Sequence, residues 1–451
     1  MSAEPSILLR RDVIAALRRG TVPRRGLDLF AVGTEWFDAA LQEELQRVAA
    51  GGAVFKAIRG EFGCGKSFTA RWFQQRALEA GWAVAEVQIS VNDTPLHRLE
   101  TVYRRAMESL RTREWDQGAF RSLVTAWLMS LEDEVVDVEG VDAGDSESLA
   151  RLVGRLLEGR LANVSATQPQ FAAALRACHA ALVKEDYSTS EGLMAWLMGQ
   201  PNVGAAIKRR AGIKGDVDHT GAMAFLRGLL TVLRQTGRPG LMLVLDEVET
   251  IQRVRADSRE KSLNALRQLI DDVYGGRFPG LYVLITGTPA FFDGPQGVRR
   301  LPPLAQRLHV DFGEHARFDN PRDVQIRLSP FDLDKLVEVG AKVRDLFPSD
   351  HPDRIREKVT NEVLRWLGEG VAGKIGGKVG IAPRIYLRKL VAGILDRVDL
   401  HHDFDPKQHY RLVLEASEMS PEEREAAGIQ RSVDDIKLDL SDAGGGGSKL
   451  E

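Results

Sequence analysis

Residues Gly60-Glu61-Phe62-Gly63-Cys64-Gly65-Lys66-Ser67 fit the pattern G-x-x-x-x-G-K-[ST], in which a glycine-rich loop wraps around a phosphate. The apolar run 53–58 before the loop predicts a buried strand, and residues 67–73 predict the first turns of a helix. Glycines let backbone amides point inward, and the dipole of the following helix favours the same anion. A glycine-rich turn without a ligand is the plain alternative. We predict that this loop binds a nucleoside triphosphate.

The side chains of the loop have distinct expected roles. Lys66 is expected to reach the β- and γ-phosphates, and the hydroxyl of Ser67 is expected to ligate Mg²⁺. The predicted cofactors are therefore ATP and Mg²⁺. Val32 and Gly33 are candidates for the adenine pocket, because they belong to an apolar segment ahead of the first strand. The remaining contacts to the nucleotide are expected from Gly60, Glu61, Phe62, Gly63, Cys64, Gly65 and Phe68.

A second acidic motif follows an apolar run at residues 241–245, which predicts a central parallel strand buried on both faces. The run ends in Asp246-Glu247. We expect Asp246 to hold Mg²⁺ and Glu247 to orient and deprotonate the water that attacks the γ-phosphorus. Glu249 is the neighbouring alternative, although it lies beyond the expected end of the strand. The acidic pair therefore predicts a hydrolase rather than a protein that only binds nucleotide.

The composition is that of an ordinary globular protein. The chain has 451 residues, with 43% hydrophobic and 28% charged residues and a net charge of −3, which argues against a globally basic nucleic-acid coat. The two cysteines cannot form a disulfide framework or a zinc site, so a cytoplasmic location is expected. No apolar run approaches the roughly 20 residues that span a bilayer, so no membrane partner is expected.

Strands that alternate with helices predict an α/β fold with a parallel sheet. Between Ser67 and Asp246 the chain has roughly a hundred residues more than a few strand–helix units need, and this surplus has helical periodicity. It is interpreted as a region that recognises a partner or substrate, with a plain scaffold as the alternative. Its acidic stretch Glu132–Glu147 is predicted to be a solvated loop.

The predicted domains follow from these patterns. Six arginines between residues 10 and 25 indicate either a solvated basic helix face or a contact surface for nucleic acid or a neighbouring subunit. The predicted division is 1–50 for a basic helical segment that contributes to the adenine pocket, 51–110 and 216–315 for the α/β core, 111–215 for the helical insertion, 316–400 for a helical lid, 401–443 for a tail, and 444–451 for a linker and cloning scar.

The ordered set of motifs resembles the AAA+ ATPases: a P-loop, a strand ending in Asp-Glu, a later strand with a polar end, and a helical lid. The resemblance implies a three-layer core, with Thr288, or Thr286 as second choice, positioning the attacking water. It also implies an arginine finger that completes the site of a neighbouring protomer. Arg307 has the matching position, and Arg299 and Arg300 are rivals.

The lid and four further stretches sharpen this resemblance. Gly380-Ile381-Ala382-Pro383-Arg384 resembles a sensor motif in which Arg384 touches the γ-phosphate. Residues 18–23, 30–33, 59–67 and 286–292 are similar to the DUF2791 group, to which BREX phage-defence ATP-binding proteins belong. That likeness implies an ATP hydrolase that forms a homo-oligomeric ring or filament and acts with other defence proteins, with DNA as a further candidate partner.

Two other functions stay open at this point. One is a slowly hydrolysing, nucleotide-gated assembly switch that recruits other proteins. The other is a DNA-loading ATPase of the initiator or transposition type, although the residues beyond the predicted lid are too few for the winged helix of the initiators. A small-molecule kinase is disfavoured by the lid, the candidate finger and the long insertion.

Overall fold

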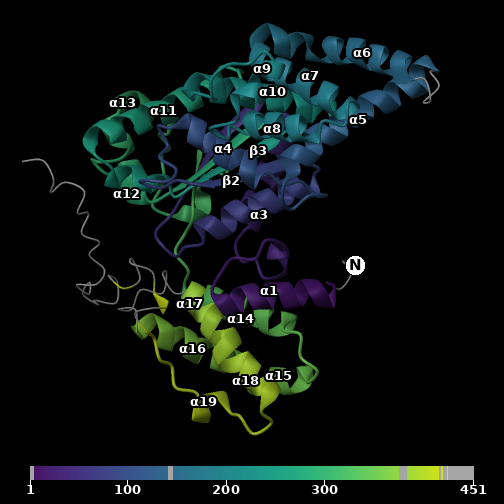
Figure 1. The fold of residues 1–451 in the computed structure, drawn as a ribbon. Coiled ribbons are helices and arrows are strands. Elements are labelled where there is room, and N and C mark those ends of the chain that lie inside the picture. The colour runs from purple at the N-terminus through teal and green to yellow at the C-terminus, as the bar shows by residue number, and fades with distance from the viewer. Residues whose placement is uncertain (1–4, 141–145, 375–382, 416–417, 420–423, 425–451) are drawn as a thin grey trace, which may run out of the picture. The chain divides into compact units, whose positions relative to one another are not determined.

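The computed structural model describes residues 5–140, 146–374 and 383–415, together with Glu418, Met419 and Arg424. It divides into two compact units, which Figure 1 traces. The first unit is Val22–Ser329, and the second combines Met1–Thr21 with Pro330–Glu451. Within the described residues, no helix has both the length and the apolar character needed to cross a membrane.

The first unit is built on a five-stranded sheet with the strand order β2-β3-β4-β1-β5. All neighbouring strands in it are parallel. β3 and β4 are buried along their whole length, as expected for apolar strands covered on both faces. The predicted α/β class with a parallel sheet is thereby confirmed. The strands are β1 (Ala53–Arg59), β2 (Ala83–Gln88), β3 (Leu241–Asp246), β4 (Leu281–Gly287) and β5 (Gln325–Arg327).

The strand register brings three carboxyl ends to one edge of the sheet. Arg59 at the end of β1 lies opposite Gly287 of β4, and Leu245 of β3 lies opposite Ile285 of the same strand. Because β4 lies between β1 and β3, the chain leaves all three strands at neighbouring points. Open parallel sheets bind their ligands at this edge. The register therefore positions the residues after β1, β3 and β4 to form one site.

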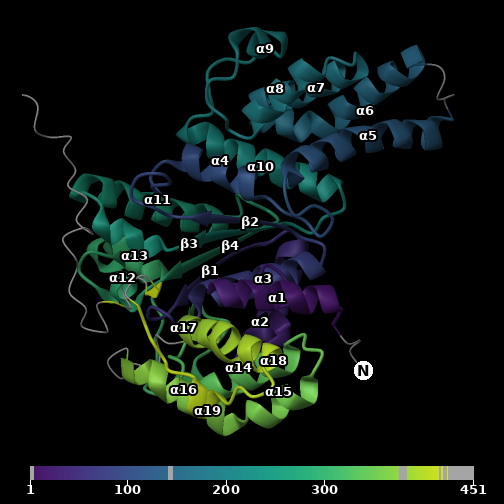
Figure 2. The ribbon, with the colours of Figure 1, turned by 60° about the horizontal axis from the view of Figure 1, so that its bottom comes forward.

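Helices cover both faces of the sheet and give three layers (Figure 2). On one face, the ring of Phe37 in α2 lies 5.5 Å from the ring of Phe73 in α3. On the other face, apolar side chains of α4, α10 and α11 form one core cluster with Leu243 and Val283. The helices are α2 (Glu35–Ala49), α3 (Lys66–Glu79), α4 (Leu99–Ser109), α10 (His219–Gln235) and α11 (Ala256–Tyr274), with the short α12 (Pro289–Asp293) and α13 (Pro302–Arg307) after β4.

The region predicted as an insertion is helical and shares the core of the sheet. The ring of Phe225 on α10 lies 5.2 Å from Phe171 of α7 and 5.1 Å from Trp196 of α8. These rings belong to the same buried cluster as the strands, so the insertion extends the core of the first unit. Its described helices are α5 (Ala119–Glu139), α6 (Ser146–Thr167), α7 (Pro169–Val183), α8 (Tyr187–Leu197) and α9 (Ala205–Arg210).

The predicted solvated loop over Glu132–Glu147 is wrong as far as Glu139, because α5 continues to that residue, and wrong again at its last two residues, where α6 begins. Leu131 and Val135 are both buried. Their spacing of four residues gives the acidic stretch an apolar helical face, which a count of charges does not reveal. On another face, Glu134 accepts hydrogen bonds of 2.6 and 2.7 Å from Arg160 of α6. Residues 141–145 lie outside the described part of the chain.

The second unit is helical, and α1 belongs to it. Val13, Ile14 and Leu17 of α1 are buried. The predicted segment 1–50 is thus divided, with α1 in the helical unit and α2 in the α/β unit. A π-helical segment, Lys389–Leu395, connects α17 to α18. The described helices are α1 (Ile7–Arg19), α14 (Leu333–Leu346), α15 (Pro352–Lys358), α16 (Asn361–Lys374), α17 (Pro383–Arg388), α18 (Asp396–Leu400) and α19 (Pro406–His409).

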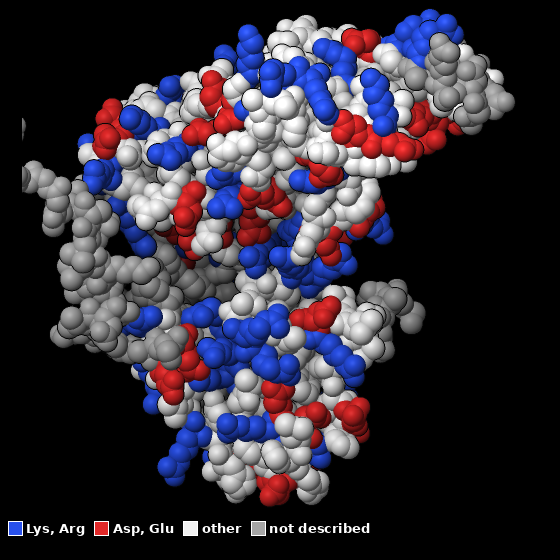
Figure 3. All heavy atoms as spheres, viewed as in Figure 1, with Lys and Arg blue, Asp and Glu red and all other residues white. Residues whose placement is uncertain are grey.

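Two of the N-terminal arginines bind within the helical unit. Arg18 forms a bidentate pair with Asp396 at 2.7 and 2.8 Å. Arg10 donates a 2.9 Å hydrogen bond to the carbonyl oxygen of Leu346, which ends α14. Lys and Arg side chains gather on the face of this unit that carries α1 and α17 (Figure 3). Some of the predicted basic face therefore serves to attach α1 to its own unit.

Candidate active site

The glycine-rich loop connects β1 to α3, as its position in the sequence predicts. Gly63 and Gly65 have φ angles of 79° and 96°, in the left-handed region that favours glycine. At Gly60, an added Cβ would collide with the Sγ of Cys64. The backbone N–H of Gly60 donates a 3.1 Å hydrogen bond to the carbonyl of Gly287 at the end of β4. The loop is therefore closed tightly against the edge of the sheet.

Lys66 is folded back onto its own loop. Its Nζ donates hydrogen bonds to the carbonyl oxygens of Gly60, at 3.0 Å, and Glu61, at 3.3 Å. The same ammonium lies 4.8 Å from the centre of the Phe62 ring. Its side chain is only 9% exposed. A bound phosphate would compete with these carbonyl groups for the lysine.

Ser67 and Asp246 meet directly, although 179 positions separate them in the chain. The hydroxyl of Ser67 donates a 2.9 Å hydrogen bond to Oδ2 of Asp246. Mg²⁺ sites in nucleotide-binding proteins use one or two such oxygen atoms together with phosphates and waters. Among the described residues, no group of three or more His, Cys, Asp or Glu side chains could hold a metal by itself. The residues present thus fit an ion that is shared with a bound phosphate.

Glu247 follows the end of β3 with a φ of 60°, in the left-handed region. This turn directs its backbone N–H to Oγ1 of Thr286, at 3.0 Å, and to Oδ1 of Asp246, at 3.1 Å. Its carboxylate is exposed and accepts a 3.0 Å hydrogen bond from the amide of Gln88. The side chain proposed to activate water is therefore open to water at the carboxyl edge of the sheet.

The structure brings Thr286, rather than Thr288, into contact with the acidic pair. Thr286 is fully buried and donates a hydrogen bond to Oδ1 of Asp246. Thr288 precedes α12 as its N-cap residue, and its carbonyl accepts a 2.9 Å hydrogen bond from Phe291. β4 extends through Gly287, so Thr286 still belongs to the strand beside β3. The sequence suggested both threonines and ranked Thr288 first; which of the two positions the attacking water stays a prediction.

Glu249 is the site residue to which sequence reasoning gave least weight. It lies in a 3₁₀ helix, Val248–Arg253, that begins directly after Glu247. The turn returns the side chain to the interior, where its Oε1 lies 3.8 Å from Nζ of Lys66. Both carboxylate oxygens are buried, and neither has a hydrogen-bond partner among the residues that the structure describes. Burial raises the pKa of Glu249, while the charge of Lys66 acts in the opposite direction.

The apolar segment proposed for the adenine pocket reaches the start of α3. The ring of Phe30 is buried and lies 5.4 Å from the ring of Phe68, in an edge-to-face arrangement. Val32 is half-buried, and Gly33 is exposed with a φ of 70°. This contact holds the segment next to the end of the phosphate-binding loop.

The candidate arginine fingers differ in their surroundings. Arg307 on α13 donates hydrogen bonds to Asp271 of α11 and to the carbonyl of Pro303. Arg299 and Arg300 are both exposed, in a 3₁₀ turn before α13. All three belong to the α/β unit.

Arg384 lies in the first turn of α17, in the helical unit. It donates a 2.9 Å hydrogen bond to the carbonyl oxygen of Glu418. Residues 380–382 of the same predicted motif lie outside the described part of the chain.

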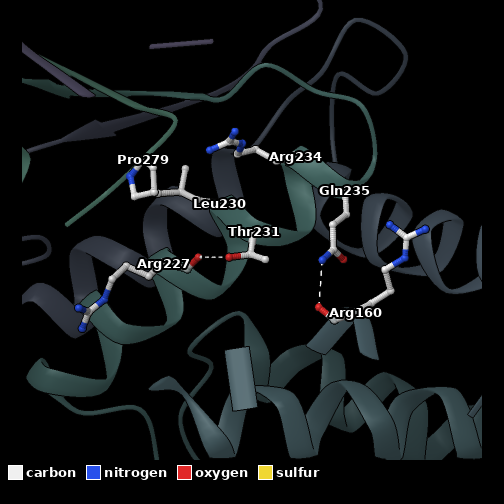
Figure 4. A pocket seen from close by; sticks show the side chains of 7 residues that line it. All are labelled: Arg160, Arg227, Leu230, Thr231, Arg234, Gln235 and Pro279. Atoms are coloured by element: carbon white, nitrogen blue, oxygen red, sulfur yellow. Dashed lines mark hydrogen bonds between the residues drawn. The ribbon is translucent and has the colours of Figure 1, made fainter. Parts of the chain in front are cut away.

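A separate pocket of about 410 Å³ is lined by side chains of α6, of α10 and of the turn before β4 (Figure 4). Two of its arginines have structural partners, because Arg160 binds Glu134 and the guanidinium of Arg227 stacks 5.8 Å from the centre of the Phe278 ring. The first contact joins α6 to α5 and the second joins α10 to the turn before β4, so we assign the pocket no ligand. It is lined by Arg160, Arg227, Leu230, Thr231, Arg234, Gln235 and Pro279.

The fold and site define a P-loop nucleotide-binding protein with a parallel α/β core. The family model described as BREX system ATP-binding protein BrxC/D matches residues 8–413, and the chain belongs to this family. The resemblance drawn from the sequence is thereby confirmed. The family supports ATP as the ligand and a role in BREX phage defence. No curated protein matches the chain.

Proposed function

We propose that this chain is an AAA+ ATPase that couples ATP binding and hydrolysis to oligomeric assembly and to DNA or protein remodelling in BREX defence. The observation that carries the proposal is the connected set of hydrogen bonds from Ser67 through Asp246 to Thr286. It joins the phosphate-binding loop to the ends of β3 and β4, next to Lys66. A site that only bound phosphate would not need a buried acidic residue oriented from two strands.

The proposed reaction assigns a separate task to each residue. Lys66 leaves the carbonyls of its own loop and contacts the β- and γ-phosphates. Ser67 and Asp246 hold Mg²⁺, which neutralises charge on the phosphate oxygens when it is bound. Thr286 fixes the orientation of the Asp246 carboxylate. Glu247, exposed beside Asp246, orients the water and accepts its proton.

Arg307 and Arg384 are proposed to respond to the γ-phosphate from outside the loop. For Arg307 to act as a finger in a neighbouring protomer, it must exchange Asp271 for a phosphate oxygen. Arg384 would act from the start of α17. To do so it must exchange its hydrogen bond to the carbonyl oxygen of Glu418 for one to a phosphate oxygen. A finger supplied in trans requires self-assembly, so the proposal includes a homo-oligomer. The other proposed partners are further defence-system proteins and DNA.

The test is steady-state hydrolysis together with ATP binding for the wild-type chain and Glu247→Gln. We expect the variant to keep its affinity for ATP within about threefold and to lose on the order of 10²- to 10⁴-fold in kcat, because a positioned base contributes that much. Glu260→Gln, an exposed glutamate on α11, is the matched control and should keep the wild-type rate. An unchanged rate in Glu247→Gln would remove this residue from the role of base.

A nucleotide-gated switch with slow hydrolysis is the second candidate. It is favoured by the arrangement of Lys66 and Glu247, which are bound to the loop carbonyls and to Gln88. Turnover measured against protein concentration, with and without DNA, separates the two functions. Concentration-dependent and DNA-stimulated turnover supports the remodelling or DNA-loading ATPase. Negligible turnover with ATP-dependent complex formation supports the switch.

A further inference from the structure

We propose that Glu249 is a positioning residue that retains Lys66 in the nucleotide-free site and opposes phosphate binding, so that it sets the affinity for nucleotide. The inference rests on the proposed nucleotide site at the loop but concerns a residue outside both motifs. Its role differs from that of Glu247, because it acts on the lysine rather than on water.

The contacts of Glu249 point to this role. Its side chain is 7% exposed, and neither carboxylate oxygen has a hydrogen-bond partner within the described structure. Its ion pair is with Lys66, at 3.8 Å. A carboxylate that served only to stabilise the fold would be expected to accept hydrogen bonds when buried, because an unsatisfied buried charge is costly. The unused oxygens of Glu249 instead lie beside the lysine of the phosphate-binding loop.

The surrounding charges make the position unfavourable for a second anion. Asp246 and Glu247, which precede the 3₁₀ helix, both act to raise the pKa of Glu249. The charge of Lys66 acts on Glu249 in the opposite direction. When the β- and γ-phosphates take this lysine, Glu249 loses its counter-ion and faces further negative charge. The free energy gained when Lys66 contacts phosphate is thus reduced by the free energy lost when Lys66 leaves the carboxylate of Glu249.

Removal of the charge should therefore tighten nucleotide binding. In Glu249→Gln we expect the Kd for MgADP and MgATP to fall on the order of tenfold, since charges a few ångströms apart in a partly buried site interact strongly. Glu249→Met should act in the same direction, because it also removes the charge. Glu249→Asp keeps the charge and should stay within about threefold of the wild type. Glu260→Gln makes the same change of charge on the exposed surface of α11 and should leave the Kd unchanged, because water and salt screen exposed charges.

The experiment measures Kd by calorimetry on the full chain, KM and kcat for ATP, and the melting temperature without nucleotide. A lower Kd and KM in both neutral variants, with kcat within about threefold of wild type, supports the proposal. Equal or weaker binding in the neutral variants that still melt as the wild type does would overturn it. A large loss of kcat at unchanged Kd would also overturn it and make Glu249 the water-activating group. Absence of nucleotide binding by the wild-type chain is a distinct result, which refutes the proposed function itself.

Discussion

At the scale of single residues, the site depends on backbone positions that admit no side chain. Gly60 begins the loop, where a Cβ would collide with Cys64 and lie 3.2 Å from Cβ of Leu328 on the chain leaving β5. The buried thiol of Cys64 has a raised pKa because of its burial, so it acts as a packing group there. Glycine is therefore required at position 60 because Cys64 and Leu328 leave no room for a Cβ atom.

Gly60→Ala should weaken ATP binding by more than about tenfold, because the loop must open to admit the new methyl group. Gly204→Ala is a suitable control, since a Cβ at Gly204 would have no atom within 4 Å. Fluorescence titration with a labelled ATP analogue measures both. If Gly60→Ala binds the ATP analogue with wild-type affinity, the loop accommodates the added methyl group without loss of binding free energy.

The contact of Thr286 with Asp246 gives a second prediction at this scale. Thr286→Val keeps the shape of the side chain but removes the hydrogen bond to a carboxylate, which is worth about 1.5–3 kcal/mol. We expect kcat for ATP to fall about ten- to a hundredfold. Thr288→Val, at the N-cap of α12, should change kcat by less than about threefold. A larger loss in Thr288→Val than in Thr286→Val would support the ranking made from the sequence.

At the scale of elements, a buried ion pair fastens α2 to the sheet. Lys56 in the middle of β1 is 1% exposed, and its Nζ lies 2.5 Å from a carboxylate oxygen of Glu44 on α2. Tyr282 of β4 donates a 2.6 Å hydrogen bond to the other oxygen of Glu44. The same ammonium donates to the carbonyls of Pro321 and Asp323, ahead of β5. One lysine thus connects a helix and the edge strand to the central strands.

Lys56→Met should lower the free energy of unfolding by about 3–5 kcal/mol, because it leaves the largely buried carboxylate of Glu44 without its cation. Lys261→Met, on the exposed surface of α11, should change it by less than about 0.5 kcal/mol. Denaturation in urea, followed by circular dichroism, measures both variants. If Lys56→Met is as stable as wild type, the pair does not contribute to stability, and the lysine is retained for another reason.

At the scale of the whole molecule, the proposed finger predicts that protomers complement one another. A Lys66→Ala chain lacks a working loop but supplies Arg307, and an Arg307→Ala chain supplies an intact loop. Each should be nearly inactive alone. In an equal mixture, about one interface in four combines both intact parts, so ATPase activity should return to about a quarter of wild type.

The same mixing experiment identifies the finger among its rivals. Arg299→Ala and Arg300→Ala should hydrolyse ATP alone at near wild-type rates if Arg307 is the finger. Arg307 is not the residue supplied in trans if Arg307→Ala hydrolyses ATP by itself. It is also not that residue if the mixture of Lys66→Ala with Arg307→Ala stays inactive while a mixture of Lys66→Ala with Arg299→Ala or Arg300→Ala regains ATPase activity. Each variant alone, at the same total concentration, provides the baseline.

Much of the fold could be predicted because the relevant signals are local. The loop, the apolar strands before Gly60 and Asp246, and the helical periodicity between them all depend on short-range patterns. The prediction of a solvated loop was wrong up to Glu139. The apolar side chains of Leu131 and Val135 outweigh the surrounding charges only because α5 has other helices to pack against. The contact of Thr286 with Asp246 could not be foreseen, because it depends on the pairing of β3 with β4, and the ranking of Thr286 and Thr288 stays a prediction.

The sequence by itself determined the class of the fold, the phosphate-binding loop and the acidic pair, since backbone geometry and residue chemistry at a few adjacent positions suffice for these. Only the tertiary structure decided which distant side chains meet. It joined Ser67 to Asp246 and Thr286, and α1 to the helical unit. It also brought Glu249 beside Lys66, because a 3₁₀ helix follows the buried strand directly, and the spacing of residues does not encode that contact.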